Sequence, residues 1–446
     1  MTRIFSQARP ADHGRSASPR RILTFTAVAD AVVRNWRRFL VWFYRPSTAF
    51  WPCAALGVVL WSLPLQYGCG ITHREELTIP VVAVLIAWYG GISLSAWLGE
   101  RIAAATPLLR LPRIDEAGFY FVATLFSVVG VGASWYTIVK SGVPLYDMVE
   151  NTRGNDLKVA LYDNYSFLST WRYSAALTGG IALFRLLFRD RRGLIDFLNV
   201  GLLLAAAVIS ARLLLVQSVF ICFGAAVRFG GLQRFRPLKL LVFGGLGFVT
   251  LASMTWLREA GYYARFEHGD NPVWAQCLHV RRYVASPFQG AAGTARIAWE
   301  EPNRPLGSLK PWKNFLPTFL HSTEEKQNDA FGHNQWTLGQ IDIDEELSTN
   351  SALAQLYGDL GIWCFPFMGL TALVLAWGIG LAWKLDNPLF LLSLIPLYGF
   401  FELWRMFLFN QGFVFFLLAE IVACSFLTVL LPWRRNDNQQ FLIDRR

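Results

Sequence analysis

The strongest constraint on this chain is a succession of apolar runs, each about twenty residues long, along most of its length. A helix of about twenty apolar residues crosses the ~30 Å hydrocarbon core of a bilayer. Only 16% of the residues are charged, whereas soluble domains carry roughly 25%. The pattern therefore predicts an all-α polytopic membrane protein. It excludes a soluble globular domain, a disordered chain and a disulfide scaffold.

The apolar runs predict about ten transmembrane helices. They lie near 47–67, 78–99, 117–139, 168–188, 194–210, 213–228, 240–257, 352–383, 388–404 and 411–432. A single helix over 194–228 would be about 50 Å long, which is too long for the bilayer core. Two short helices that turn at Arg212 fit better, and they place the basic clusters on either side of the stretch at the same membrane face.

Charge placement predicts the orientation and the domains. With both termini inside, most Lys and Arg residues lie in the inner segments, as the positive-inside rule requires. We therefore expect a basic cytoplasmic tail with an amphipathic helix (1–46), helices one to seven (47–257), a large periplasmic loop (258–350), helices eight to ten (351–433) and a cytoplasmic tail (434–446). A loop as long as 258–350 is usually functional, and its composition predicts a partly folded cap.

Arginines near the outer membrane face are the clearest candidate binding groups. Charges at membrane depth are costly, so they are usually paired or functional. Guanidinium groups hold phosphate in a bidentate way and stay charged at any working pH. A ring of them predicts a phosphate or pyrophosphate site, against the alternative of ordinary snorkelling to lipid head groups. The outer arginines are Arg172, Arg212, Arg258, Arg265, Arg281, Arg282, Arg296 and Arg405.

Acidic residues and histidines supply the candidates for proton transfer. Asp359 lies early in the eighth predicted span, and His333 lies among small and polar neighbours in the large loop. Glu402 and Arg405 are three residues apart and can pair on one helix face. Glu420 falls in the middle of the tenth span, where it must be protonated, paired or next to a polar cavity. No histidine or cysteine spacing matches a metal site, so we expect no metal.

Three short segments carry a resemblance to a known family. Residues 350–361, which read NSALAQLYGDLG and include Asn350 and Tyr357, resemble the stretch after the large loop of bacterial oligosaccharide repeat unit polymerases, the O-antigen polymerase (Wzy) class. Residues 282–287 resemble a Tyr-x-x-Ser-Pro stretch in the loop of those proteins. Residues 209–212 resemble their turn between two short spans. The resemblance in architecture covers nearly the whole chain.

The resemblance implies a glycosyltransferase with a GT-C-like fold, in the cytoplasmic (inner) membrane of a bacterium, that needs neither metal nor cofactor. It would transfer a growing glycan from undecaprenyl diphosphate to a sugar hydroxyl of the next lipid-linked unit, building a surface polysaccharide. Arg212 and Arg282 would stabilise the diphosphate leaving group, and Asp359 or His333 would accept the hydroxyl proton. The substrate-binding residues would be Arg172, Arg265, Arg281, Arg405, Tyr357 and Asn350.

The implied partners are the undecaprenyl-diphosphate-linked oligosaccharide, membrane lipid, a chain-length co-polymerase and a flippase, with no nucleic acid. Two alternatives stay open. An O-antigen ligase would share the layout and the donor but would use lipid A-core as acceptor. A flippase or other transporter of lipid-linked oligosaccharides would use Glu420, although the chain has no evident internal repeat, which transporters often have. The sugar composition and the linkage are left open.

Overall fold

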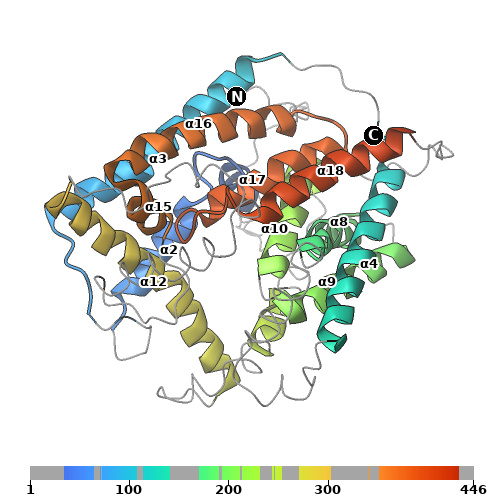
Figure 1. Ribbon diagram of the computed structural model, residues 1–446, viewed down its shortest axis with the longest axis horizontal. Coiled ribbons are helices and arrows are strands. Elements are labelled where there is room, and N and C mark those ends of the chain that lie inside the picture. The colour runs from blue at the N-terminus through green and yellow to red at the C-terminus, as the bar shows by residue number, and fades with distance from the viewer. Residues whose placement is uncertain are drawn as a thin grey trace, which may run out of the picture.

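The computed structural model describes residues 35–64, 71, 73–107, 114–140, 170–189, 193–210, 213–231, 244–245, 247–253, 271–302, 341 and 351–430. In these ranges the regular elements are helices (Figure 1). They are α2 (Trp51–Ser62), α3 (Ile79–Ala105), α4 (Glu116–Lys140), α8 (Ser174–Phe188), α9 (Leu194–Ser210), α10 (Leu213–Arg228), α12 (Pro272–Glu300), α15 (Ala352–Leu360), α16 (Cys364–Trp383), α17 (Leu391–Glu402) and α18 (Gly412–Leu430). The 3₁₀ turns η6 (Gly361–Trp363) and η7 (Pro388–Phe390) precede α16 and α17.

Four helical stretches in the described part are long and apolar enough to cross a membrane: α3, α4, α18 and the stretch Ala352–Trp383 formed by α15 and α16. The prediction of an all-α membrane protein is therefore confirmed at this level. Helices also lie in five more of the ten predicted spans, but these are shorter, and α2 has only 12 residues. The predicted span 240–257 is described only at 244–245 and 247–253.

The stretch 194–228 forms two helices, α9 and α10, as the position of Arg212 predicts. The first ends at Ser210 and the second begins at Leu213, and residues 211–212 lie outside the described residues. The single span predicted at 352–383 is interrupted by η6, where Gly361 adopts a positive φ of 55°. A positive φ is cheap for glycine and costly for other residues, so the sequence favours the interruption at this residue.

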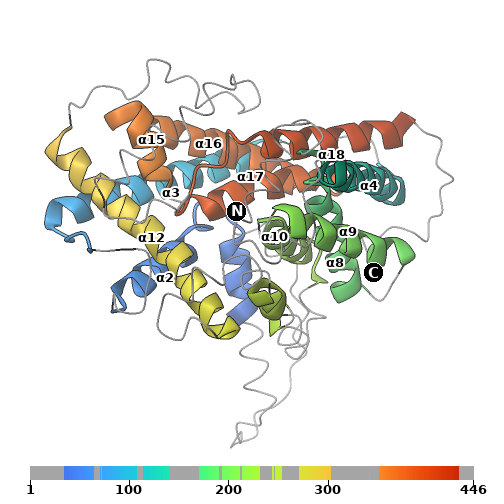
Figure 2. The ribbon, with the colours of Figure 1, turned by 60° about the horizontal axis from the view of Figure 1, so that its bottom comes forward.

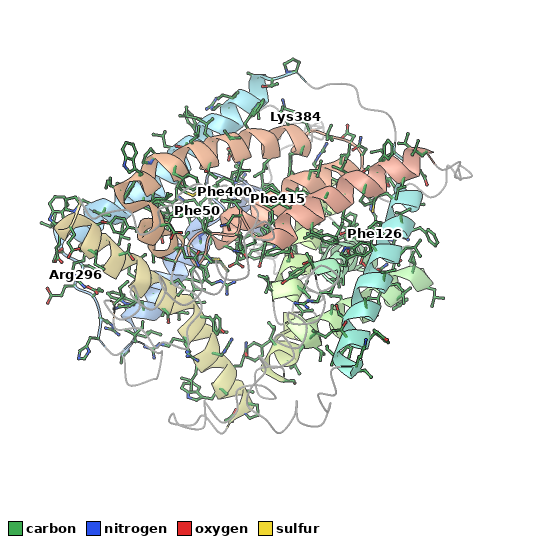
Figure 3. All side chains as sticks on the ribbon, in the orientation of Figure 1. Phe50, Phe126, Arg296, Lys384, Phe400 and Phe415 are labelled. Atoms are coloured by element: carbon green, nitrogen blue, oxygen red, sulfur yellow. The ribbon has the colours of Figure 1, made fainter. Side chains whose placement is uncertain are left out.

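The helices form two groups that α17 and α18 join (Figures 1 and 2). One group contains α2, α3, α12, α15 and α16, and the other contains α4, α8, α9 and α10. Small residues allow close approach within each group, as is common between membrane helices. A Cβ on Gly99 of α3 would lie 2.3 Å from the Leu373 carbonyl oxygen of α16. Phe50 and Phe400, labelled in Figure 3, are fully buried between the elements.

The predicted large loop contains a 29-residue helix, α12, that packs against α2, α3 and α15. Asn271 caps its first turn by accepting hydrogen bonds from Val273 N and Trp274 N. Farther along, Gln289 accepts from Trp61 Nε1 (2.7 Å) and donates to the carbonyl of His73 (2.9 Å). Gln289 also accepts from the Glu75 amide and donates to the Ile341 carbonyl. This one side chain therefore ties α12 to three other segments.

Arg296, near the end of α12, adds an ion pair with Glu75 at 2.9 Å. Its hydrogen bonds to that carboxylate hold the pKa of Arg296 above its usual range. Figure 3 shows Arg296 at the edge of the molecule. The pair joins α12 to the segment just before α3.

Polar contacts group several helix ends at one end of the bundle. Lys384, after α16, donates to the Ala103 and Thr106 carbonyls at the end of α3. Arg228, at the end of α10, donates to the Trp383 carbonyl at the end of α16 (2.7 Å). The C-terminal ends of α3, α10 and α16 therefore lie together, which agrees with the alternation of the predicted spans.

A second contact at helix ends joins α4, α8 and α9. Asp196, at the start of α9, forms an ion pair with Arg185 of α8 (2.7 Å) and accepts from the hydroxyl of Tyr120 of α4 (3.1 Å). Asp196 is fully buried, so its charge depends on these partners.

We expect Asp196→Ala to destabilise the fold by about 3–5 kcal/mol, because it leaves the mostly buried Arg185 guanidinium without its carboxylate. Asp386→Ala is the matched control, since Asp386 pairs with Arg228 but its side chain is 75% exposed. An exposed pair contributes about 0–1 kcal/mol. Thermal unfolding in detergent measures both, and equal losses would contradict the role assigned to Asp196.

We expect Gln289→Leu to cost at least about 2 kcal/mol, because it leaves the Trp61 N–H and two backbone carbonyls without their partner. Thr294→Val on the same helix is the control. The Thr294 hydroxyl bonds only the Gly290 carbonyl of its own helix, so its loss should be small. Limited proteolysis within 271–302 should become faster only in the Gln289 variant. Unchanged rates would refute the role of Gln289 in holding α12 to the other segments.

Candidate functional site

The candidate site is centred on Arg405, in the turn between α17 and α18. Glu402 Oε2 accepts from Arg405 Nε (2.8 Å), and Glu402 Oε1 accepts from the Tyr398 hydroxyl (2.6 Å). The predicted Glu402–Arg405 pair is thus confirmed. The Glu402 side chain is 5% exposed, whereas that of Arg405 is 18% exposed. Nη1 and Nη2 of Arg405 have no hydrogen-bond partner among the described residues, so they remain available to a ligand.

Two other elements, α2 and α12, meet at this turn. Tyr283 of α12 and Cys53 of α2 lie close enough to interact electrostatically with Arg405. At Gly57 of α2 an added Cβ would lie 3.1 Å from the Val284 carbonyl oxygen and 4.0 Å from the Trp404 ring. The absence of a side chain at Gly57 therefore lets α2, α12 and the Arg405 turn come together.

The backbone of the turn is fixed by the start of α15. The Arg405 carbonyl accepts from Ser351 N (2.8 Å), and Phe407 N donates to Gln355 Oε1 (2.8 Å). Ser351 is fully buried, has a φ of 83° and caps α15 through its hydroxyl. A positive φ at a non-glycine residue costs of order 1–3 kcal/mol and is retained where the surroundings demand it. The hydrogen bond from Ser351 N to the Arg405 carbonyl, which holds the Arg405 turn against α15, accounts for this strained conformation.

The charge of Arg405 is stable in this setting. Burial lowers the pKa of Arg405, but Glu402, Tyr398 and Tyr283 together more than offset that effect, so the pKa of Arg405 lies above its usual value. A charged guanidinium whose Nη1 and Nη2 have no hydrogen-bond partner among the described residues suits a bidentate oxyanion such as a phosphate, because its N–H groups lie in one plane. The same geometry does not suit a base, because both oxygens of Glu402 are already occupied.

The predicted arginines of α12 take different roles. Arg281 Nη2 donates to the carbonyls of Leu63 (2.7 Å) and Pro64 (2.6 Å), just after the end of α2. Helix C-terminal carbonyls lack partners and attract cations, so Arg281 acts as a cap. Arg282 is buried and directly precedes Tyr283. The structure therefore brings Arg282 and Arg405 into neighbouring elements.

Arg172 lies in the turn before α8 and is 2% exposed. Its Nε and Nη1 have no hydrogen-bond partner among the described residues. The guanidinium lies over the ring of Tyr173, and that ring stacks on Phe413 of α18 at 4.8 Å. Arg405 begins the segment 405–413, and Arg172 lies near its other end, through Tyr173 and Phe413. A buried guanidinium with unused donors is costly without a partner, which makes Arg172 the second candidate anion-binding group.

The remaining predicted residues fall elsewhere. The Tyr357 hydroxyl donates to the Glu301 carbonyl (3.1 Å), which holds α15 to the end of α12. Asp359 is half-buried near the end of α15 and lies about 12 Å along the helix from Ser351, at 1.5 Å per residue. Arg212, Arg265, His333 and Asn350 lie outside the described residues. Among the described residues, neither predicted base lies next to Arg405.

Sequence reasoning missed three members of the site. Tyr398 precedes Glu402 by four residues, which is a helical contact spacing, so this contact was within reach of the sequence. Tyr283 and Cys53 are far from Arg405 along the chain. No local pattern signals those contacts, because they arise from tertiary packing.

Comparison with known proteins supplies no relative for this site. No family model, curated protein or solved structure matches the chain. The site has to be understood from its own residues: a buried and oriented guanidinium at Arg405, a second at Arg172, and hydroxyl and aromatic groups around them.

Proposed function

We propose that this protein is a metal-independent glycosyltransferase of the cytoplasmic membrane that polymerises lipid-linked oligosaccharide units. We further propose ten spans in a GT-C-like arrangement with both termini cytoplasmic. The observation that carries the proposal is the Arg405 guanidinium. It is oriented by Glu402, held by strained backbone, and has two donors with no partner among the described residues. That arrangement suits a diphosphate that gains negative charge as it leaves.

In the proposed reaction, a sugar hydroxyl of one lipid-linked unit attacks the anomeric carbon of the glycan carried by another. The new oxygen–carbon bond forms as the bond from that carbon to the diphosphate oxygen breaks. Undecaprenyl diphosphate leaves with the electron pair, and its charge is stabilised by donors that are already in place. Arg405 supplies them in this proposal, with Arg172, Arg212 and Arg282 as further cations. The hydroxyl proton passes to Asp359 or His333.

We expect purified protein, given the native undecaprenyl-diphosphate-linked unit in the presence of EDTA, to form a ladder of polymer. Arg405→Lys should slow the reaction about 10²–10³-fold, because lysine keeps the charge but loses the bidentate donors. Arg101→Lys is the control, since the exposed Arg101 contacts the Trp97 ring on α3 and not the site. A full ladder from Arg405→Lys, or from Arg212→Ala, would remove that residue from the mechanism.

An O-antigen ligase remains the nearest alternative within the same chemistry. It would use the same donor and the same guanidinium groups but a different acceptor. In a deletion strain, single units on the final acceptor indicate a missing polymerase, whereas polymer left on undecaprenyl diphosphate indicates a missing ligase.

One observation favours a transporter as a second candidate. Glu420 of α18 is 2% exposed, and neither carboxylate oxygen has a hydrogen-bond partner among the described residues. The Ser174 hydroxyl of α8 lies beside it. Gln217 of α10 is also fully buried, and both of its amide atoms lack a partner in the part of the chain that the structure describes. Intramembrane carboxyl groups without partners often serve proton relays, which a lipid-linked oligosaccharide flippase could use.

The two candidates give opposite results for Glu420→Gln, a change that keeps the shape and removes the ionisable group. A polymerase should retain its ladder, because Glu420 is neither one of the proposed cations nor one of the proposed bases of the transfer. A proton-coupled flippase should lose transport of the lipid-linked unit across proteoliposomes, measured from the unit accessible on each side. Loss of transport by the variant, together with the absence of any ladder from the wild type, would replace the polymerase proposal.

A further inference from the structure

Buried polar side chains follow one another through the group of α4, α8 and α9 (Figure 1), and the proposed transfer uses none of them. At one end, the Tyr120 hydroxyl donates to Asp196 (3.1 Å), which pairs with Arg185. One turn along both helices, Asn199 Nδ2 donates to the Thr124 hydroxyl (2.8 Å). Asp196 and Asn199 are fully buried. The polar contacts therefore start at the ion pair and lead into the interior.

The contacts continue about one turn deeper. The hydroxyls of Ser127 on α4 and Thr178 on α8 are 2.8 Å apart, and both residues are fully buried. Thr178 also donates to the carbonyl of Ser174 (3.2 Å), and the Ser174 hydroxyl lies beside the Glu420 carboxyl group of α18. The polar line that ends at Glu420 thus consists of Asp196, Tyr120, Asn199, Thr124, Ser127, Thr178 and Ser174.

The polar line spans about half of the bilayer core. Arg185 and Ser174 are eleven residues apart on α8, which is about 16 Å at 1.5 Å per residue, whereas the core is ~30 Å thick. A Cβ on Gly231, just after α10, would lie 3.1 Å from the Phe188 Cβ at the end of α8. Since Glu420 lies near the middle of α18, the polar line connects the membrane face at which α8 and α10 end with the middle of the span.

Helix packing explains the paired members of the polar line but not Glu420. Hydroxyl and amide side chains commonly join membrane helices, and the contact of Ser127 with Thr178 does so here. However, the two oxygens of Glu420 and the Oδ1 of Asn199 have no hydrogen-bond partner among the described residues. Buried polar atoms of this kind are usually satisfied by internal water. Water can also bridge the one-turn step between the polar contacts along α4.

No ion pair holds a charge on Glu420 in the described part of the chain. The Ser174 hydroxyl faces it from α8, and the Cys424 thiol lies one turn along its own helix. The ionisable groups of the other packed elements do not pair with it, namely Glu116, Tyr120, Tyr136 and Lys140 of α4, Arg172, Tyr173 and Arg185 in and before α8, and Tyr398 and Glu402 of α17. An unpaired carboxyl group at this depth is stable when it carries a proton.

We propose that the polar line is a path by which Glu420 exchanges a proton with the membrane face at which α8 and α10 end. The neutral acid gives its proton to the hydroxyls and internal water of the path, water at that face takes up a proton, and the reverse transfer restores the acid. In the proposed orientation this face is cytoplasmic. The inference goes beyond the polymerase proposal and does not depend on it, and it supplies the route that a proton-coupled transporter would need.

Hydrogen–deuterium exchange tests the path in the full-length protein reconstituted into vesicles. A protonated carboxyl group has an infrared C=O band that shifts when deuterium replaces its proton, and Glu420→Gln identifies the band. Thr178→Val keeps the shape of the side chain and removes the hydroxyl that contacts Ser127. Exchange at Glu420 should slow at least about tenfold, because the proton must then pass an apolar group. Ser127→Ala breaks the same contact from α4 and should slow the exchange in the same way.

Thr137→Val is the matched control for these two variants. The Thr137 hydroxyl donates to the Ala133 carbonyl of its own helix, ten residues beyond Ser127 on α4. Its loss should leave the exchange rate at the wild-type value. Wild-type rates in both Thr178→Val and Ser127→Ala would overturn the path, and the absence of the band from the wild type would overturn the protonation of Glu420.

A hydrophobic carbodiimide shows from which face the proton comes, because such reagents modify protonated carboxyl groups in membranes. Glu420 should be labelled, as located by peptide mass, and Glu420→Gln should not. In oriented vesicles, a higher pH at the face where α8 and α10 end should lower the labelling rate, by about tenfold per unit once most of the acid is ionised. A higher pH at the other face alone should have no effect.

The opposite dependence on the two faces would overturn the path. Protection of Glu420 by Na⁺ at constant pH would assign the site to a metal cation and overturn the proton assignment. Labelling controlled from the expected face, without any transport of the lipid-linked unit, would refute the flippase and support the path. The presence or absence of a polymer ladder decides the polymerase proposal separately.

Discussion

The absence of water from the bilayer core governs how this chain uses its charges. A helix end leaves carbonyls without partners, and inside a membrane protein another group of the protein must satisfy them. Lys384 donates to carbonyls at the end of α3, Arg228 to those at the end of α16, and Arg281 to those after α2. These cations fasten one helix to the next. A membrane arginine is thus not by itself a sign of ligand binding.

The functional proposal depends on two arginines that do not satisfy helix-end carbonyls in this way. Arg172 and Arg405 close no helix end in the described part of the chain. Arg405 is held on one side by Glu402 and is unoccupied on the other, whereas Arg172 has two buried nitrogens without partners. The pair with Glu402 offsets the burial of Arg405, whereas two buried nitrogens of Arg172 have no such partner among the described residues. A bound oxyanion would supply a partner to both guanidinium groups. Ligand binding is the simplest account of why these two charges remain.

Local patterns in the sequence predict the features that depend on neighbouring residues, such as helix breaks and pairs on one helix face. Arg212 predicts the break between α9 and α10, and the spacing of Glu402 and Arg405 predicts their pair. Hydropathy predicts a loop where α12 forms, because Arg281, Arg282 and Gln289 lower its apolar character. Those polar residues are nevertheless buried, since partners from distant segments satisfy them, as Trp61 and His73 do for Gln289. The electrostatic proximity of Tyr283 to Arg405 depends on the same long-range packing, so the sequence alone does not reveal it.

Buried acids follow the same logic as buried arginines. Glu100 accepts from the amide and the hydroxyl of Ser47, Asp196 pairs with Arg185, and Glu402 pairs with Arg405. Glu100 and Asp196 each join two segments, and Glu402 has partners on its own helix and the turn after it, so the burial of all three is accounted for by structure. Glu420 has only a serine hydroxyl beside it and joins nothing by an ion pair in the described part. Because an unpaired carboxylate at this depth is costly, Glu420 must be neutral or hydrated there. A structural role is therefore a weaker explanation for Glu420 than for the other three acids.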